Sequence, residues 1–291
     1  MEKHFLVTVS EQKSAFFGLR FMGLLFSSKE EIKVTLFYMA PRPPTVWPDE
    51  QAHESVIESE RKIKQNEVKG RDALETAKKE LIKFGFSQDK IGTKFQVRRF
   101  SKVEDIIQEG AKGLYDAVIL GRRGLSLLET AFDESVTIDL LKEKVNFPIW
   151  LCRMPDLERK NVLMCVDGSE PSRRMADHVG FILGEEKSQE VTLLVVKRPG
   201  GKLKDSPENI LSKSKEILLS NGFPSEMAKT KVIEARNVSD TILKEAEEGK
   251  FAAVALGRTG VGQGLLKSIF MGSVSDTLFR ELKGAALWVC Q

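Results

Sequence analysis

The residues best suited to chemistry begin with an aspartate in a short polar turn. Asp167-Gly168-Ser169 directly follows an apolar run that ends at Val166. An aspartate at the carboxyl end of a strand can accept hydrogen bonds from a ligand's hydroxyl or amino group. Asp167 or Ser169 could instead cap the helix that follows. The sequence leaves both roles open.

A glycine-rich loop follows a second apolar run, which ends at Leu256. Its glycines, and the Gly-Ser pair that opens the next helical pattern, are Gly257, Gly260, Gly262, Gly264, Gly272 and Ser273. Glycines let a backbone approach a ligand closely, and the free N–H groups at a helix start attract anions. The spacing fits neither the dinucleotide nor the Walker fingerprint. The composition nevertheless favours a phosphate site over an ordinary turn.

The elements that must position these residues alternate between strand and helix patterns. Strands are predicted at 161–166, 191–196, 229–235, 252–256 and 285–289, and helices at 171–183, 209–220, 239–248 and 272–281. Nearly continuous apolar runs are typical of parallel strands that are buried on both faces. Five such strands predict an open, doubly wound α/β domain, which binds ligands outside the carboxyl ends of its strands.

The same pattern occurs twice along the chain. In order, 34–37 matches 191–194, 120–124 matches 256–260, and 149–152 matches 287–290. The offset falls from 157 to 136 residues, so the first copy holds about twenty extra residues in a proline-containing loop and a charged stretch, 49–83. That stretch is predicted to be helical, with Gly70 as a weak point. We predict two tandem domains, 1–157 and 158–291, joined by a charged linker.

Composition excludes several classes of protein. The 291 residues carry 45 Lys and Arg against 42 Asp and Glu, a net charge of +3, which argues against a nucleic-acid coat. The three histidines and three cysteines show no metal-ligand spacing, and no general base or nucleophile–histidine pair is evident, so we assign no metal and no catalytic residue. The longest apolar stretch, 15–26, is too short to span a membrane and predicts a buried helix. With no export signal, we expect a cytoplasmic protein.

The strand-end aspartate, the glycine loop and the strand order together resemble the universal stress protein family. That family has an Asp after its first strand and, after its fourth, G-x-x-G, nine residues, then G-[ST]. The resemblance covers the chain twice, as in tandem members. It implies two Rossmann-like domains of the adenine nucleotide alpha hydrolase type, each with a five-stranded parallel sheet flanked by helices. It also implies ATP, alone or with Mg²⁺, as the ligand of the second domain.

By this resemblance, Asp167 would contact the adenosine part of the nucleotide. The remaining residues would line the adenine pocket (Val166, Val196), pack on the ribose (Leu256, Gly257) and approach the phosphates (Gly260, Gly272, Ser273, Val274). Eleven residues separate Gly260 from Gly272, and counting from Gly262 restores nine. Either glycine can therefore hold that place in the pattern.

The first copy departs much further from the family pattern. Ser10 stands where the second copy has Asp167, and Asp133 and Glu134 stand where a phosphate would dock. Two like charges 4 Å apart repel by ~4 kcal/mol at an effective dielectric constant of about 20. We predict that the first domain does not bind a nucleoside triphosphate in the usual way.

Three functions remain open at this point. The resemblance implies an adenine-nucleotide-binding protein of stress response or signalling that is not an enzyme, with slow ATP hydrolysis left open. The alternatives are a nucleotide-independent dimerisation or interaction module and an enzyme of related fold. Family members often pair their last strands across a dimer. Trp150 and Trp288, which occupy equivalent places there, are predicted to pack in an interface within the chain or in a homodimer.

Overall fold

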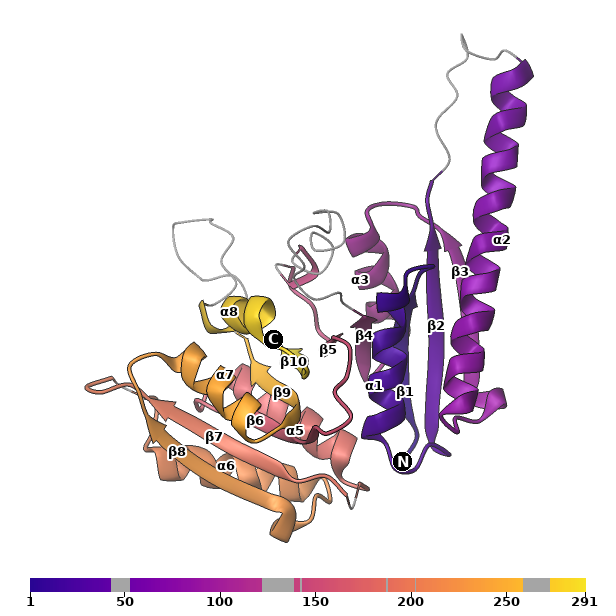
Figure 1. Ribbon diagram of the computed structural model, residues 1–291. Coiled ribbons are helices and arrows are strands. Elements are labelled where there is room, and N and C mark those ends of the chain that lie inside the picture. Colours follow the sequence, from indigo (N-terminus) through magenta and orange to yellow (C-terminus); the bar gives the residue numbers. More distant parts are fainter. Residues whose placement is uncertain (43–52, 122–138, 142, 187, 202, 259–272) are drawn as a thin grey trace.

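The computed structural model describes residues 1–42, 53–121, 139–141, 143–186, 188–201, 203–258 and 273–291 (Figure 1). These residues form one ten-stranded sheet in the order β3-β2-β1-β4-β5-β10-β9-β6-β7-β8. The strands of the first half are β1 (Lys3–Val9), β2 (Ile32–Ala40), β3 (Ile91–Val97), β4 (Ala117–Gly121) and β5 (Ile149–Cys152). Those of the second half are β6 (Lys160–Cys165), β7 (Val191–Lys197), β8 (Ala228–Glu234), β9 (Phe251–Gly257) and β10 (Ala286–Cys290). The predicted fold class, a mostly parallel α/β sheet flanked by helices, is confirmed.

The helices cover both faces of this sheet. They are α1 (Phe17–Leu25), α2 (His53–Lys83), α3 (Lys102–Lys112), α5 (Glu170–Leu183), α6 (Pro207–Ser220), α7 (Val238–Glu248) and α8 (Ser273–Glu281). Short 3-10 turns lie at η1 (Lys13–Phe16), η3 (Gln88–Lys90) and η4 (Ser225–Met227). One core packs α1, α2, α5 and α6 on one face, and a second packs α3, α7 and α8 on the other. Each core spans both halves, because the sheet is continuous through the middle of the molecule.

The two halves join through their last strands. β5 and β10 pair antiparallel, with Trp150 opposite Trp288, whereas the other paired strands run parallel. The two indole rings stack 4.0 Å apart at 5°, and both side chains are fully buried. The prediction of intrachain pairing through the last strands is therefore confirmed. The antiparallel pair gives the chain an internal twofold relation.

The charged stretch of the first half forms α2, which runs past the ends of β2 and β3 (Figure 1). Gly70 does not interrupt this helix. It is buried, and a Cβ there would lie 2.6 Å from the rings of Tyr38 and Phe95. The prediction of a weak point at Gly70 is wrong, because the glycine lets α2 pack closely on the sheet.

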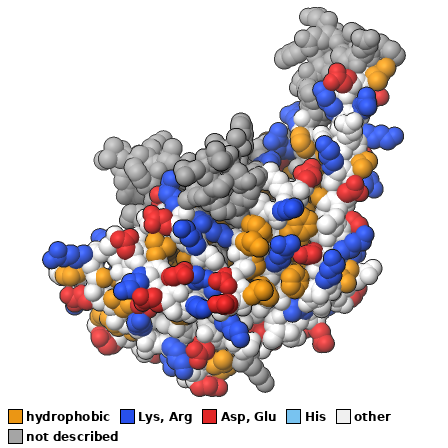
Figure 2. Space-filling view, in the orientation of Figure 1, with side chains coloured by type: hydrophobic (Ala, Val, Ile, Leu, Met, Phe, Trp, Pro, Cys, Tyr) orange, Lys and Arg blue, Asp and Glu red, His pale blue; other side chains and the backbone are white. Residues whose placement is uncertain are grey.

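Among the described residues, no helix has the length and apolar character needed to cross a bilayer. The apolar stretch predicted as a buried helix forms η1 and α1, which pack into the core. On the face shown in Figure 2, lysine and arginine side chains are intermixed with aspartate and glutamate.

Candidate functional site

The carboxyl ends of β7, β6 and β9 lie side by side in the sheet. Cys165, the last residue of β6, pairs with Leu194 on one side and with Leu256 on the other. The Val166 N–H then donates to the carbonyl of Leu194 at 2.9 Å. The structure thus brings to one edge the predicted residues that it describes at these strand ends: Val166, Asp167, Val196, Leu256 and Gly257.

In the turn after β6, the helix-capping role belongs to Ser169, and the ligand role of Asp167 stays a prediction. Ser169 caps α5, since its hydroxyl accepts from the Ser172 N–H at 3.3 Å. Asp167 Oδ1 accepts from the Ser169 N–H at 2.9 Å, and Gly168 sits at φ +76°, where a side chain would be strained. Asp167 is exposed, and its Oδ2 has no hydrogen bond among the described residues. Serine therefore caps the helix, and the aspartate keeps one oxygen free for a ligand.

Gly257 has a structural role that the sequence did not reveal. A Cβ at this position would lie 2.2 Å from the backbone of Pro171 and Ser172. The glycine therefore lets the end of β9 press against the first turn of α5. It holds the glycine-rich loop beside the Asp167 turn.

Arg258, one residue further on, is buried, and part of its guanidinium has no partner among the described residues. Its side chain belongs to a residue only 4% exposed, and its N–H donates to the carbonyl of Cys290 at 2.7 Å. Its Nε and Nη1 are buried without a hydrogen-bond partner in the part of the chain that the structure describes. Burial lowers the pKa of this guanidinium. Residues 259–272 contain no aspartate or glutamate, so the adjoining segment supplies no carboxylate. An unpaired buried cation is costly, and an anionic ligand would relieve that cost.

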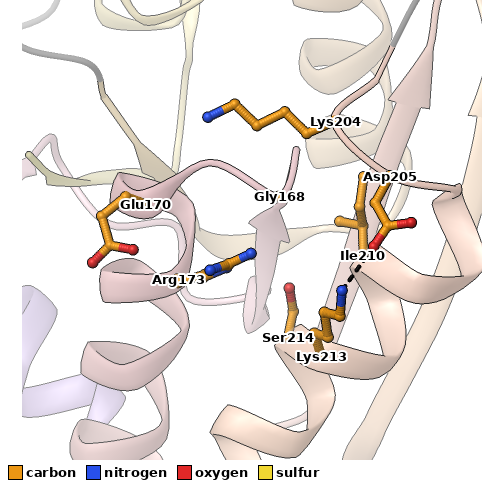
Figure 3. Close-up of a pocket in the computed structure, with 8 residues that line it drawn as sticks. All are labelled: Gly168, Glu170, Arg173, Lys204, Asp205, Ile210, Lys213 and Ser214. Atoms are coloured by element: carbon orange, nitrogen blue, oxygen red, sulfur yellow. Dashed lines mark hydrogen bonds and ion pairs between the residues drawn. The ribbon is translucent and has the colours of Figure 1, made fainter.

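A cleft of about 400 Å³ opens beside the Asp167 turn, between α5 and α6 (Figure 3). Lys204 extends across it above Gly168, and Arg173 reaches toward it from α5. Neither cation forms an ion pair among the described residues. Lys213 pairs with Asp205 at 2.7 Å, which lowers the pKa of that carboxyl to about 2. The cleft thus presents two available cations at the carboxyl edge of the sheet.

The equivalent place in the first half is filled by its own side chains. Glu11 stands where the second half has Gly168, and it accepts a hydrogen bond from the Tyr38 hydroxyl at 2.5 Å. Tyr38 in turn stacks on Phe95 with ring centroids 5.7 Å apart. Burial and the Glu11 contact raise the pKa of Tyr38 well above its usual range, so the phenol stays a donor. The first half thus places a bonded carboxylate at the position that Gly168 holds in the second half.

Several predicted residues belong to the glycine loop and the helix after it. Ser273 begins α8, and Val274 is half-buried against the core of that face. Gly260, Gly262 and Gly272 lie outside the described residues, as do Asp133 and Glu134.

Sequence reasoning missed the cations of the site. Arg173 and Lys204 line the cleft, and neither is among the residues predicted from the sequence. One available signal was the basic run at the carboxyl end of β7, which carries Lys197, Arg198, Lys202 and Lys204. Burial of Arg258 has no sequence signal, because it depends on how β9 and β10 pack.

Comparison with known proteins gives the lineage of this fold. The universal stress protein family model matches residues 158–287. The second half of the chain therefore contains a universal stress protein domain. A search of curated proteins returns no significant match.

Solved structures extend the likeness in fold to the first half of the chain. A universal stress protein from Archaeoglobus fulgidus DSM 4304 superposes with a TM-score of 0.71 at 17% identity, covering 99% of this chain and 98% of that one. A functionally unknown protein from Pseudomonas aeruginosa PAO1 gives a TM-score of 0.54 at 14% identity, covering 99% of this chain and 92% of that one. At these identities the likeness establishes the fold of the full chain.

Proposed function

We propose that this universal stress protein binds ATP in its second domain and serves a stress-response or signalling role in the cytoplasm. The observation that carries the proposal is the buried, unpaired guanidinium of Arg258 beside the glycine-rich loop. A phosphate would supply the missing anion, and the start of α8 would add N–H donors. The domain boundary near residue 157 is part of the same proposal.

In this proposal, Asp167 holds the adenosine part of the ligand. Its free Oδ2 suits a ribose hydroxyl or an adenine amino group, both of which donate hydrogen bonds. The apolar side chains of Val166 and Val196 line the adenine pocket, and Leu256 and Gly257 pack against the ribose. The loop glycines, Ser273 and Val274 are assigned to the phosphates. Mg²⁺, where present, would be carried with the nucleotide, because no group of three metal-ligating side chains occurs among the described residues.

The role assigned to the second domain is binding, with any hydrolysis slow. The first domain is assigned a supporting role, because the Glu11–Tyr38 pair fills the equivalent place. The same pair favours a second candidate, an interaction module in which neither domain needs nucleotide.

The deciding experiment measures nucleotide in the purified protein and adds a matched pair of variants. Denaturing the purified chain should release about one adenine nucleotide per molecule, and the stripped chain should bind ATP saturably in calorimetry. Asp167→Ala should weaken ATP binding about tenfold or more, whereas Ser10→Ala at the equivalent position should leave it unchanged. No released nucleotide and no ATP binding by the stripped chain would overturn the proposal in favour of the interaction module.

A further inference from the structure

The residue that follows the last strand of each half lies beside the opposite half. Arg153 comes directly after β5, and Gln291 comes directly after β10. These positions are equivalent, because the sequence at 149–152 matches that at 287–290. The two strands pair antiparallel, so the end of each lies beside the start of the other. The end of β5 is therefore next to the segment that joins α8 to β10 (Figure 1).

Arg153 binds the C-terminal end of α8 from this position. Its Nη2 donates to the carbonyls of Phe279 and Arg280, at 2.7 and 2.9 Å. The carbonyls of a helix's last turn lack partners within the helix, and the helix dipole makes that end negative. A guanidinium supplies both the donors and the positive charge that such an end favours. The gap that remains between Arg153 and the apolar residues of α8 is about 10 Å³, room for no more than about one water molecule.

The reverse contact, from the second half to the first, is made by an uncharged side chain. Gln291 Nε2 donates to the carbonyl of Glu143 at 2.6 Å, and its Oε1 accepts from the Val145 N–H at 3.2 Å. Glu143 closes a helical turn, since its own N–H donates to the carbonyl of Asp139 at 3.2 Å. The halves thus exchange the same kind of contact across the joint. The half that receives the cation is the one whose strand-end aspartate follows the family pattern.

α8 depends on contacts of this kind because it is short. It spans 9 residues, and isolated helices shorter than about 12–15 residues are marginal in water. One face of the helix lies in the core, where Leu278 and Phe279 are buried. So short a helix moves as one body. A contact that fixes its last turn therefore also fixes the position of its first turn.

We propose that Arg153 is a positioning residue for the nucleotide site: through the last turn of α8, the first half fixes the start of the helix at which the phosphates bind. This role rests on the proposed function, which assigns Ser273 and Val274 at that start to the phosphates. The adenosine part of the ligand is assigned to Asp167, which follows β6 and belongs to a different element. The contribution of Arg153 therefore concerns the phosphates and leaves the nucleoside contacts as they are.

The experiment compares ATP with adenosine in calorimetry on the full-length chain. Arg153→Gln introduces the residue of the equivalent position 291. It should weaken ATP binding about fivefold and leave adenosine affinity within about twofold. Arg153→Lys keeps a cation at the same helix end and should hold ATP affinity within about twofold of the parent chain. The matched control, Gln291→Ala, removes the reverse contact and should leave ATP binding unchanged.

Amide hydrogen exchange tests the positioning step in the absence of nucleotide. In the nucleotide-free chain, Arg153→Gln should speed exchange across residues 277–281 of α8 about fivefold, because the last turn loses its cation and its donor. Gln291→Ala should instead speed exchange at residues 143–145. Exchange in β6, at residues 160–165, should match the parent chain in both variants, which shows that each variant is folded.

Several results would overturn the positioning role of Arg153. They are unchanged exchange in α8, unchanged ATP affinity in Arg153→Gln, and equal losses of affinity for ATP and adenosine, which would mark a purely structural contact. A parent chain that binds no ATP would overturn the proposed function and this role together. ATP binding by the parent chain that Arg153→Gln leaves intact would overturn this role alone.

Discussion

His178 makes the joint between the halves sensitive to acid. Burial lowers the pKa of its imidazole from 6.5 to about 3, so the folded protein holds this ring neutral. The unfolded chain binds a proton at this site as the pH falls below 6.5, whereas the folded chain does not until about pH 3. The unfolded state therefore binds more protons across that window, and the free energy of unfolding falls as the pH drops through it.

The size of the effect follows from proton linkage. At pH 5, the unfolded ring is almost fully protonated and the folded ring is not, which stabilises the unfolded state by about 2 kcal/mol relative to pH 7. Replacing His178 with phenylalanine, the residue at the equivalent position 21, removes the titrating group. At pH 7 the variant should be less stable, because Trp150 Nε1 loses its acceptor at a cost of about 1–3 kcal/mol. At pH 5 the gap between the two proteins should narrow by about 2 kcal/mol.

Urea denaturation at pH 7 and pH 5, followed by tryptophan fluorescence and far-ultraviolet dichroism, measures this gap. Comparing the two proteins at each pH cancels groups that they share, including His4, whose pKa is also lowered by burial. An equal loss of stability in both proteins between pH 7 and pH 5 would refute the reasoning, since it would mean that His178 does not remain neutral in the folded state.

Three further outcomes follow from contacts in the structure. Trp150→Phe should lower the free energy of unfolding by about 1–2 kcal/mol more than Trp288→Phe. Both variants lose a buried indole, but only Trp150 Nε1 has a hydrogen-bond partner among the described residues. Urea denaturation of both variants at pH 7 checks this difference. Gly70→Ala should destabilise by about 1 kcal/mol despite alanine's helix propensity, since the Cβ meets two aromatic rings, whereas exposed Gln65→Ala should shift stability by less than about 0.5 kcal/mol in the same assay. Arg258→Gln should raise the thermal stability of the nucleotide-free protein. In calorimetry it should weaken the affinity for ATP about tenfold and leave the affinity for adenosine within about twofold. Equal losses of affinity for both ligands would contradict a phosphate role for Arg258.

Much of the fold could be predicted because the buried strands appear in the sequence as runs of apolar residues. The nine elements predicted in the second half agree with the structure to within two residues at each end, and the internal repeat transfers the same plan to the first half. The strand-end rule also places Asp167, Val196 and Leu256 at one edge, because parallel strands carry their carboxyl ends to the same side. What sequence could not supply was the close packing between elements. Gly70 illustrates this limit: its low helix propensity is visible in the sequence, but the rings of Tyr38 and Phe95 come from strands beside it only in the fold.

The two halves share the same arrangement of five strands. Several of the side chains that differ between them lie where helices meet strand ends. Trp150 and Trp288 stack across the twofold, and the surrounding strands are apolar in both halves, so a change there would disturb the joint from both sides. Gly168 beside a free aspartate oxygen in one half corresponds to Glu11 bound to Tyr38 in the other, and His178 corresponds to Phe21. The two halves therefore keep the same five-stranded plan while they differ in the side chains at these positions.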